Sequence, residues 1–276
     1  MTPRLSQGCT WVLLLAMMLA IAAGLMAWGP VHFPLVPPGD LPARLPGTAT
    51  PLDALSCLPL LVVGAWSAWV VLRDRWPRAL RMPWFAFFVS SALSAAASAL
   101  FHLQPSALVH AAGHAFGATA MTMLALAFAA ERMDVGFGSR RAVASAGAIA
   151  GVAALWWLAG HWASGHGDLR ALLFLECLPL LLLPAGALSL PGHFTRAGDW
   201  GFMLFGYVAA RALGLLDASL GGAGAGFGGH ALMHLLLAGV VAWPLYRMAA
   251  ASRRGDAPAA SPPEPTQRRT SLNTSS

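Results

Sequence analysis

Two histidines four residues apart, in the stretch HALMH at 230–234, lie at the start of a long apolar run. Residues four apart share one face of a helix, so the side chains of His230 and His234 point the same way. Two imidazoles at this spacing can hold one metal ion, as they do in other helix-borne zinc sites. A third ligand from another helix would complete a catalytic centre with three protein ligands and one water, and His102 is the natural choice.

The same spacing occurs twice more in the chain. Ser98 and His102 lie near the end of one apolar run, and His110 and His114 open the next. Ser98 would lie one helical turn from His102, where its hydroxyl could bond a metal-bound water or a developing oxyanion. In the alternative interpretation, this serine bonds the backbone of its own helix.

Three ionisable residues fall within or at the ends of other apolar runs, namely Glu176, Arg211 and Asp217. Ionisable side chains inside a membrane are costly, so they indicate function by default. The alternative is an intramembrane ion pair of Arg211 with Glu176 or with Asp217, which would fix the packing of the helices.

The composition indicates the class of protein to which these residues belong. The chain is 57% hydrophobic and only 10% charged. Apolar runs of about 20 residues recur, and each is long enough to cross a bilayer as a helix. The runs are continuous rather than alternating, which favours helices over a closed barrel. We therefore predict an all-α, polytopic transmembrane bundle with eight spans, at roughly 11–28, 52–72, 84–103, 107–130, 142–162, 170–190, 199–218 and 228–249.

Three regions follow from these spans. Residues 1–30 are interpreted as a retained transmembrane anchor, with a secretory signal as the alternative because Arg4 precedes the apolar stretch. Residues 49–250 form a membrane core of seven helices. Residues 251–276 are rich in Pro, Ser, Thr and Ala, which predicts a disordered cytoplasmic tail.

Every one of the 17 basic residues is arginine, and the formal net charge is +6. The arginines lie in short loops and tails rather than on one folded face, so the excess does not indicate a nucleic-acid partner. If the N-terminus is cytoplasmic, fourteen of the seventeen arginines fall on the cytoplasmic side, which places both termini inside. The unusual polar side chains then converge near the outer surface of the membrane. The three cysteines, Cys9, Cys57 and Cys177, have no metal-type or disulfide-type spacing and are interpreted as ordinary small residues.

Several of these stretches resemble the alkaline ceramidase family, within the superfamily of seven-helix membrane hydrolases that includes the progestin and adiponectin receptors. TPLDALSCLPLLVVG at 49–63 resembles the first core helix of bacterial members, with Cys57 in place of an asparagine. SALFH at 98–102 is similar to the Ser-x-x-x-His motif of the family, and HALMH is similar to its closing His-x-x-x-His. Two later stretches also resemble bacterial members, GDLRALLFLECLPLLLLP at 167–184 and ARALGLLDASL at 210–220.

The resemblance covers residues 49–250 and implies a seven-helix core with one extra N-terminal span. It implies a zinc ion held by His102, His230 and His234, with Ser98 close by. It also implies that a zinc-activated water cleaves an amide bond in a membrane lipid such as ceramide. The absence of lysine and the bias towards Ala, Gly, Leu and Arg are typical of a GC-rich bacterium. We therefore expect the bacterial inner membrane, with the metal site facing the periplasm.

One departure from the family concerns an aspartate expected about three turns beyond the first metal-site histidine. The corresponding stretch, SALVHAAGHAFG at 106–117, contains no acid. His114 could take over proton transfer, since the pKa of histidine suits that task, or Asp217 could serve instead. A fourth imidazole could also close the coordination shell, which would make the zinc structural.

The sequence therefore allows more than one function. The first is a zinc-dependent lipid amidase. The second is a non-catalytic protein of the same fold that binds or senses a lipid and carries a structural zinc. The third is a haem-binding electron carrier, because paired histidines from different helices can ligate haem.

Overall fold

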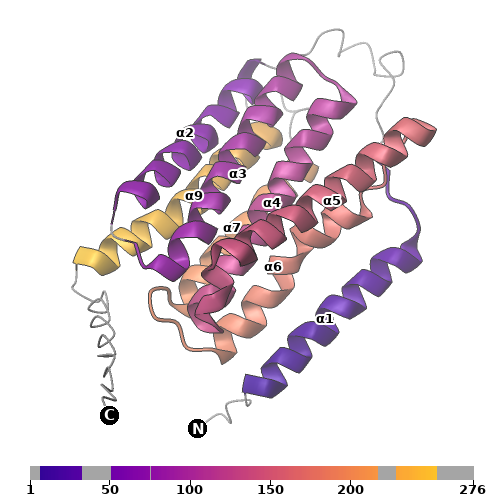
Figure 1. Ribbon diagram of the computed structural model, residues 1–276. Helices are drawn as coiled ribbons and strands as arrows, with labels where there is room; N and C mark the ends of the chain where they lie inside the picture. Colours follow the sequence, from indigo (N-terminus) through magenta and orange to yellow (C-terminus); the bar gives the residue numbers. More distant parts are fainter. Residues whose placement is uncertain (1–6, 33–50, 75, 217–227, 254–276) are drawn as a thin grey trace, which may run out of the picture.

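The chain folds into α-helices, as the computed structural model in Figure 1 shows. The structure describes residues 7–32, 51–74, 76–216 and 228–253, and all statements below concern these residues. One short 3₁₀-helix, η1 (Val135–Gly138), precedes α5. The α-helices are α1 (Gln7–Trp28), α2 (Pro51–Arg73), α3 (Arg78–Leu103), α4 (Ala107–Arg132), α5 (Arg140–Ser164), α6 (Arg170–Ser189), α7 (Ala197–Leu215) and α9 (Gly229–Arg253).

These helices confirm the predicted all-α bundle, and each begins and ends within six residues of its predicted span. Six of them, namely α2 to α6 and α9, are long and apolar enough to cross a membrane. Helix α7 is not among the six, because Asp199 and Arg211 lower its hydropathy. In α1, the stretch Leu15–Trp28 qualifies as a shorter apolar helix. The chain is thus a multi-pass membrane protein. The C-terminal region that we predicted to be disordered lies, from residue 254, outside the described residues.

Polar caps and one glycine set the helix ends. The Ser106 hydroxyl accepts from the backbone N–H of Val109 at the start of α4, and Ser139 does the same at the start of α5. Each satisfies one of the N–H groups that the first turn of a helix leaves without a partner. Helix α5 ends at Gly165, whose φ of 75° places it in the left-handed region that glycine adopts at low cost.

Six helices form a closed ring. Helix α2 packs on α3, α3 on α4, α4 on α6, α6 on α7, α7 on α9, and α9 back on α2. Helix α5 lies outside this ring against α4 and α6, and α1 packs on α6 (Figure 1). This arrangement leaves the interior of the ring enclosed by helices that are distant in the sequence.

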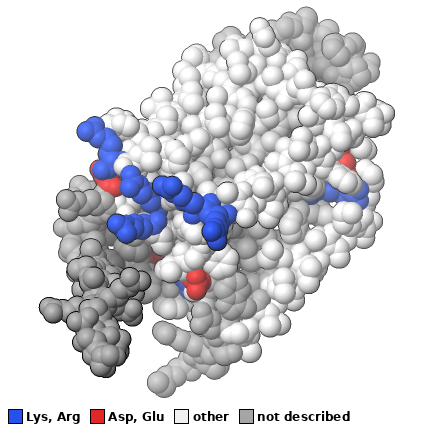
Figure 2. All heavy atoms as spheres, viewed as in Figure 1, with Lys and Arg blue, Asp and Glu red and all other residues white. Residues whose placement is uncertain are grey.

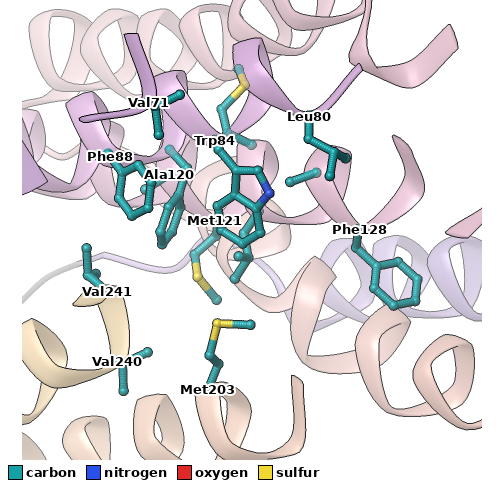
Figure 3. Packing of buried hydrophobic residues seen from close by; sticks show 14 of the residues in the cluster. Val71, Leu80, Trp84, Phe88, Ala120, Met121, Phe128, Met203, Val240 and Val241 are labelled. Atoms are coloured by element: carbon teal, nitrogen blue, oxygen red, sulfur yellow. The ribbon is translucent and has the colours of Figure 1, made fainter. Parts of the chain in front are cut away.

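One end of the ring is filled with side chains. Trp84 is fully buried among residues of α2, α3, α4, α7 and α9, as the close view in Figure 3 shows. Its ring stacks at 5.9 Å from Phe88 and at 6.0 Å from Trp200. Aromatic side chains bury the most surface per residue and therefore dominate such cores. This packing fixes the helices whose opposite ends carry the predicted metal ligands.

A buried ionic cluster ties this filled end to the α6–α7 connection. Glu131 accepts hydrogen bonds from the backbone N–H groups of Phe194, at 2.9 Å, and Thr195, at 2.7 Å. Arg132 donates to the carbonyl oxygens of Leu190 and Thr195, both at 2.7 Å. Buried charges are tolerated when their hydrogen bonds are satisfied in this way. We therefore assign Glu131 and Arg132 a structural role.

Helix α1 is fastened to the α5–α6 connection at the opposite end. Leu169 N–H donates to the Val31 carbonyl at 2.9 Å, and Val31 N–H donates to an Asp168 carboxylate oxygen at 3.3 Å. Arg170 forms an ion pair of 2.7 Å with Asp168 and also donates to the Met26 carbonyl at 3.2 Å. These bonds join the first helix to the core.

Candidate metal centre

The structure brings the three predicted imidazoles together. His102 ends α3, and His230 and His234 lie in the first turns of α9. The Nε2 atoms of His102 and His230 are 3.1 Å apart. The ring centroids of His230 and His234 are 4.8 Å apart, and those of His102 and His234 are 5.8 Å apart. The rings therefore surround a common space where α3 meets α9.

A fourth donor enters from α2. The sulfur of Cys57 and one ring nitrogen each of His102 and His234 lie within 4.8 Å of one another, so this group can hold a metal ion. The predicted ligand His230 is not part of this group among the described residues, although its Nε2 lies 3.1 Å from that of His102. The sequence interpretation of Cys57 as an ordinary small residue did not anticipate that it belongs to this group. Spacing rules compare residues within one segment, whereas this cysteine meets the histidines across helices. The substitution of Cys57 for the asparagine of the family was the one available signal.

His234 is 3% exposed, and its Nδ1 has no hydrogen-bond partner within the described part of the chain. On the other side of the ring, Nε2 lies 3.5 Å from the Ser98 hydroxyl. A buried polar atom without a partner is uncommon in a folded protein, and this makes His234 a candidate ligand.

The donor set is chemically suited to zinc. Thiolate and imidazole are ligands that zinc prefers, whereas calcium and magnesium prefer oxygen. Two nitrogens bound to one tetrahedral zinc at 2.0–2.1 Å would lie about 3.3 Å apart. The 3.1 Å between the Nε2 atoms of His102 and His230 is close to that separation. The residues present therefore fit a zinc ion.

A second polar group faces the same interior from α4, α6 and α7. Nδ1 of His114 lies 3.1 Å from Oε1 of Glu176, which is 7% exposed. The other Glu176 oxygen lies 3.7 Å from an Arg211 nitrogen. The predicted pairing of Arg211 with Glu176 is therefore present, and His114 joins it. The ring centroid of His110 lies 4.9 Å from that of His114, edge to face, and 4.7 Å from that of Phe101, at a tilt.

This arrangement bears on the role of His114. Glu176 holds one of its ring nitrogens, and His114 is not part of the metal-capable group found among the described residues. The alternative catalytic residue, Asp217, lies outside the described residues.

Both polar groups line one cavity of about 230 Å³ inside the six-helix ring. A water occupies about 10–15 Å³ by the same kind of measure, so the space exceeds that of a few waters. Ser98, the three histidines of α3 and α9, His114, Glu176 and Arg211 line one part of it. Ser91, Ser94, His110 and Tyr207 also line the cavity. The remaining wall is apolar and includes Phe87, Met121, Leu124, Leu183, Met203 and Val241. The cavity therefore combines a polar region next to the metal-capable group with an apolar region next to the Trp84 core.

Comparison of the chain with protein-family models, with curated proteins and with solved structures gives no significant match. The likeness to the alkaline ceramidases therefore depends on the motifs quoted above.

Proposed function

We propose that this protein is a zinc-dependent membrane hydrolase that cleaves the amide bond of a ceramide-like lipid. The observation that carries the proposal is the cavity, in which a group of metal-ligating side chains faces a long apolar wall. The apolar wall suits an acyl chain, and the polar region suits the amide to which that chain is attached.

The residues that would hold zinc are His102 and His234 of the metal-capable group, together with His230, which contacts His102. When bound, zinc would lower the pKa of a water molecule towards neutrality and polarise the carbonyl of the amide. The Ser98 hydroxyl, 3.5 Å from His234 Nε2, can donate to an oxygen that gains negative charge.

We assign proton transfer to the second polar group, which consists of His114, Glu176 and Arg211. When Nδ1 of His114 donates to Glu176, the lone pair of the ring is on Nε2, so the imidazole can accept a proton and return it. The carboxylate fixes the orientation of the ring and stabilises its protonated form. This pair would supply, from α4 and α6, the function of the family aspartate that this chain lacks.

The distribution of arginine supports the proposed orientation in a bacterial inner membrane. Most of the basic side chains seen in Figure 2 gather at one end of the molecule, and a smaller group lies at the opposite end. Arg73 ends α2, Arg78 begins α3 and Arg140 begins α5, all at the end of the bundle away from the histidines. Under the positive-inside rule this end is cytoplasmic. The metal site then faces the periplasm, and both termini are cytoplasmic.

The test is turnover of a panel of fluorescent N-acyl lipids by the purified, zinc-loaded full chain. We expect release of the free fatty acid from at least one N-acyl sphingoid base, and loss of this turnover in His230→Ala. Ala148→Leu, on the outward face of α5, is the matched control and should retain activity. A zinc-loaded protein that hydrolyses none of the panel would refute the proposal.

The second candidate function is non-catalytic binding or sensing of a lipid, with a structural zinc. Cys57 favours it, because Cys57 and three histidines could supply four protein ligands and leave no position for water. Binding of a non-hydrolysable N-acyl lipid by a protein without turnover would support this function. A haem carrier is a third possibility, which zinc in the absence of a Soret band would exclude.

A further inference from the structure

Cys57 is positioned by the two helices that carry the histidines. Helix α2 packs against both α3 and α9, and its second turn places Cys57 where those helices meet. The side chain is 0% exposed, and its sulfur lies within 4.8 Å of ligating nitrogens of His102 and His234. The thiol donates a hydrogen bond to the Asp53 carbonyl, at 3.3 Å within the same helix, and the Ser98 side chain is also within hydrogen-bond reach of it.

A buried cysteine usually acts as a small apolar residue, so burial alone does not indicate a ligand. The independent observation is His234, which is 3% exposed and places a ring nitrogen within 4.8 Å of both the thiol and a ring nitrogen of His102. Imidazole nitrogens and a thiol that face one small space are suited to the same kind of ion.

We infer that Cys57 is a ligand of the metal ion, together with His102 and His234. The centre is then a mixed thiolate–imidazole site rather than an all-histidine one. Binding breaks the S–H bond, forms a metal–sulfur bond and releases the proton to water. Such a donor set selects zinc over magnesium and calcium. The inference concerns the same metal centre as the proposed function and deepens it.

A Cys57 ligand would affect whether water can bind the metal ion. With Cys57 and His230 both bound, four protein donors would surround the ion, and a tetrahedral site with four protein ligands has no room for water. Cys57 therefore determines whether the centre is closed or has an open position. The all-histidine centre implied by the family resemblance has no such residue.

The experiment uses the full chain loaded with Co²⁺, because cobalt bound to a thiolate gives a sulfur-to-metal charge-transfer band in the near ultraviolet. We expect this band in the wild type and in Cys177→Ala, whose partly buried thiol is the matched control. We expect no band in Cys57→Ser or Cys57→Ala. Competition with a chelator should show that zinc affinity falls about tenfold or more, since even residues that only orient a ligand contribute that much.

A wild type without the band would overturn the inference, and so would a Cys57→Ala protein that keeps both the band and its zinc affinity. Thermal unfolding of each variant identifies loss of metal that results from misfolding, and Cys57→Ser preserves the size of the side chain for that reason. No turnover is measured here, so the two proposals fail separately. A cobalt–thiolate band in a protein that hydrolyses nothing would support the ligand and refute the amidase. Turnover without the band would do the reverse.

Discussion

At the scale of single residues, Glu176 connects His114 and Arg211, the two other side chains of the second polar group. It is the one acid among the described residues that line the cavity. One carboxylate oxygen faces His114 and the other faces Arg211. A carboxylate held between a histidine and an arginine is better suited to proton transfer through that histidine than to metal binding.

The role of His114 gives the first prediction. His114→Ala should retain one zinc per chain, because the ring is held by Glu176 and lies outside the metal-capable group. If the amidase proposal is correct, turnover should fall by about 10²-fold or more, as is typical when a general acid–base residue is removed. Metal analysis and kinetics on the same preparation measure both effects. Loss of the zinc would instead show that His114 closes the coordination shell.

The residues of the site differ in how far the sequence could reveal them. The sequence indicated Ser98 with His102, and His230 with His234, because each pair lies one turn apart in one helix, whereas the contacts between the two pairs join α3 and α9. The contact of His114 with Glu176 and that of Cys57 with His102 depend on how α2, α4 and α6 are rotated about their axes. Rotation is set by packing against neighbouring helices, which residue spacing does not specify.

At the scale of helices, the close approach of α2 to α3 places Cys57 next to His102. A Cβ on Gly64 would lie 2.9 Å from the backbone nitrogen of Ala92 and 2.9 Å from the carbonyl oxygen of Phe88. Backbone atoms cannot move aside as a flexible side chain can. Glycine at this position therefore permits the spacing, as small residues do between membrane helices.

Gly64→Ala is consequently expected to separate α2 from α3 and to destabilise the folded protein by about 1–3 kcal/mol. The melting temperature in detergent measures this change, and the zinc affinity should fall with it because α2 carries Cys57. Gly151→Ala on α5 is the control, since a Cβ there meets nothing within 4 Å. Equal melting temperatures for Gly64→Ala and the wild type would contradict the close-packing argument.

The attachment of α1 to the core gives a prediction that depends on pH. Partial burial alone would raise the pKa of Asp168, but hydrogen bonds from Arg170, Val31 and Trp156 outweigh it and lower the pKa from 3.8 to about 2. A carboxyl group whose pKa is lowered by folding stabilises the folded state above its unfolded pKa. That stabilisation is lost as the pH falls from about 4 through 2.

Asp168→Asn should therefore lower the melting temperature at pH 6 by a few degrees. The difference from the wild type should shrink as the pH approaches 2, because the wild-type carboxylate is then protonated. Thermal unfolding across this pH range measures both effects. A difference that stays constant down to pH 2 would mean that the charge of Asp168 does not contribute to the attachment of α1.

The helices themselves were predictable because the membrane imposes a simple rule on the sequence. Each crossing needs a continuous apolar run, so the positions of the helices follow from hydropathy. Hydropathy does not show which helices pack against one another. The ring closes through the contact of α2 with α9, which lie far apart in the chain, and through the contact of α4 with α6, which skips α5. Hydropathy also does not predict that α5 and α1 lie outside the ring, since their hydropathy is similar to that of the ring helices.

At the scale of the whole molecule, the cavity extends along the helix axes. Phe87 and His102 both line it from α3 and are fifteen residues apart. At a rise of 1.5 Å per residue this separation is about 22 Å, most of the roughly 30 Å hydrocarbon core of a bilayer. An acyl chain could therefore lie lengthwise in the cavity with its amide near the histidines. The length of the apolar region then limits the length of the chain.

Ala120 allows this limit to be tested. It lines the cavity from α4, about 15 Å along the helix from His110 at the same rise per residue. Ala120→Leu adds three carbon atoms to the apolar region without contacting the metal-capable group. We expect kcat/KM to fall about tenfold or more for long N-acyl chains and to change little for short ones, because only long chains reach this depth.

The zinc content should not change, and Ala148→Leu, which adds the same atoms on the outward face of α5, should leave the chain-length profile unaltered. An equal loss of kcat/KM for all chain lengths would mean that the substitution perturbs α4 rather than shortening the apolar region. The acyl chain would then have to bind elsewhere.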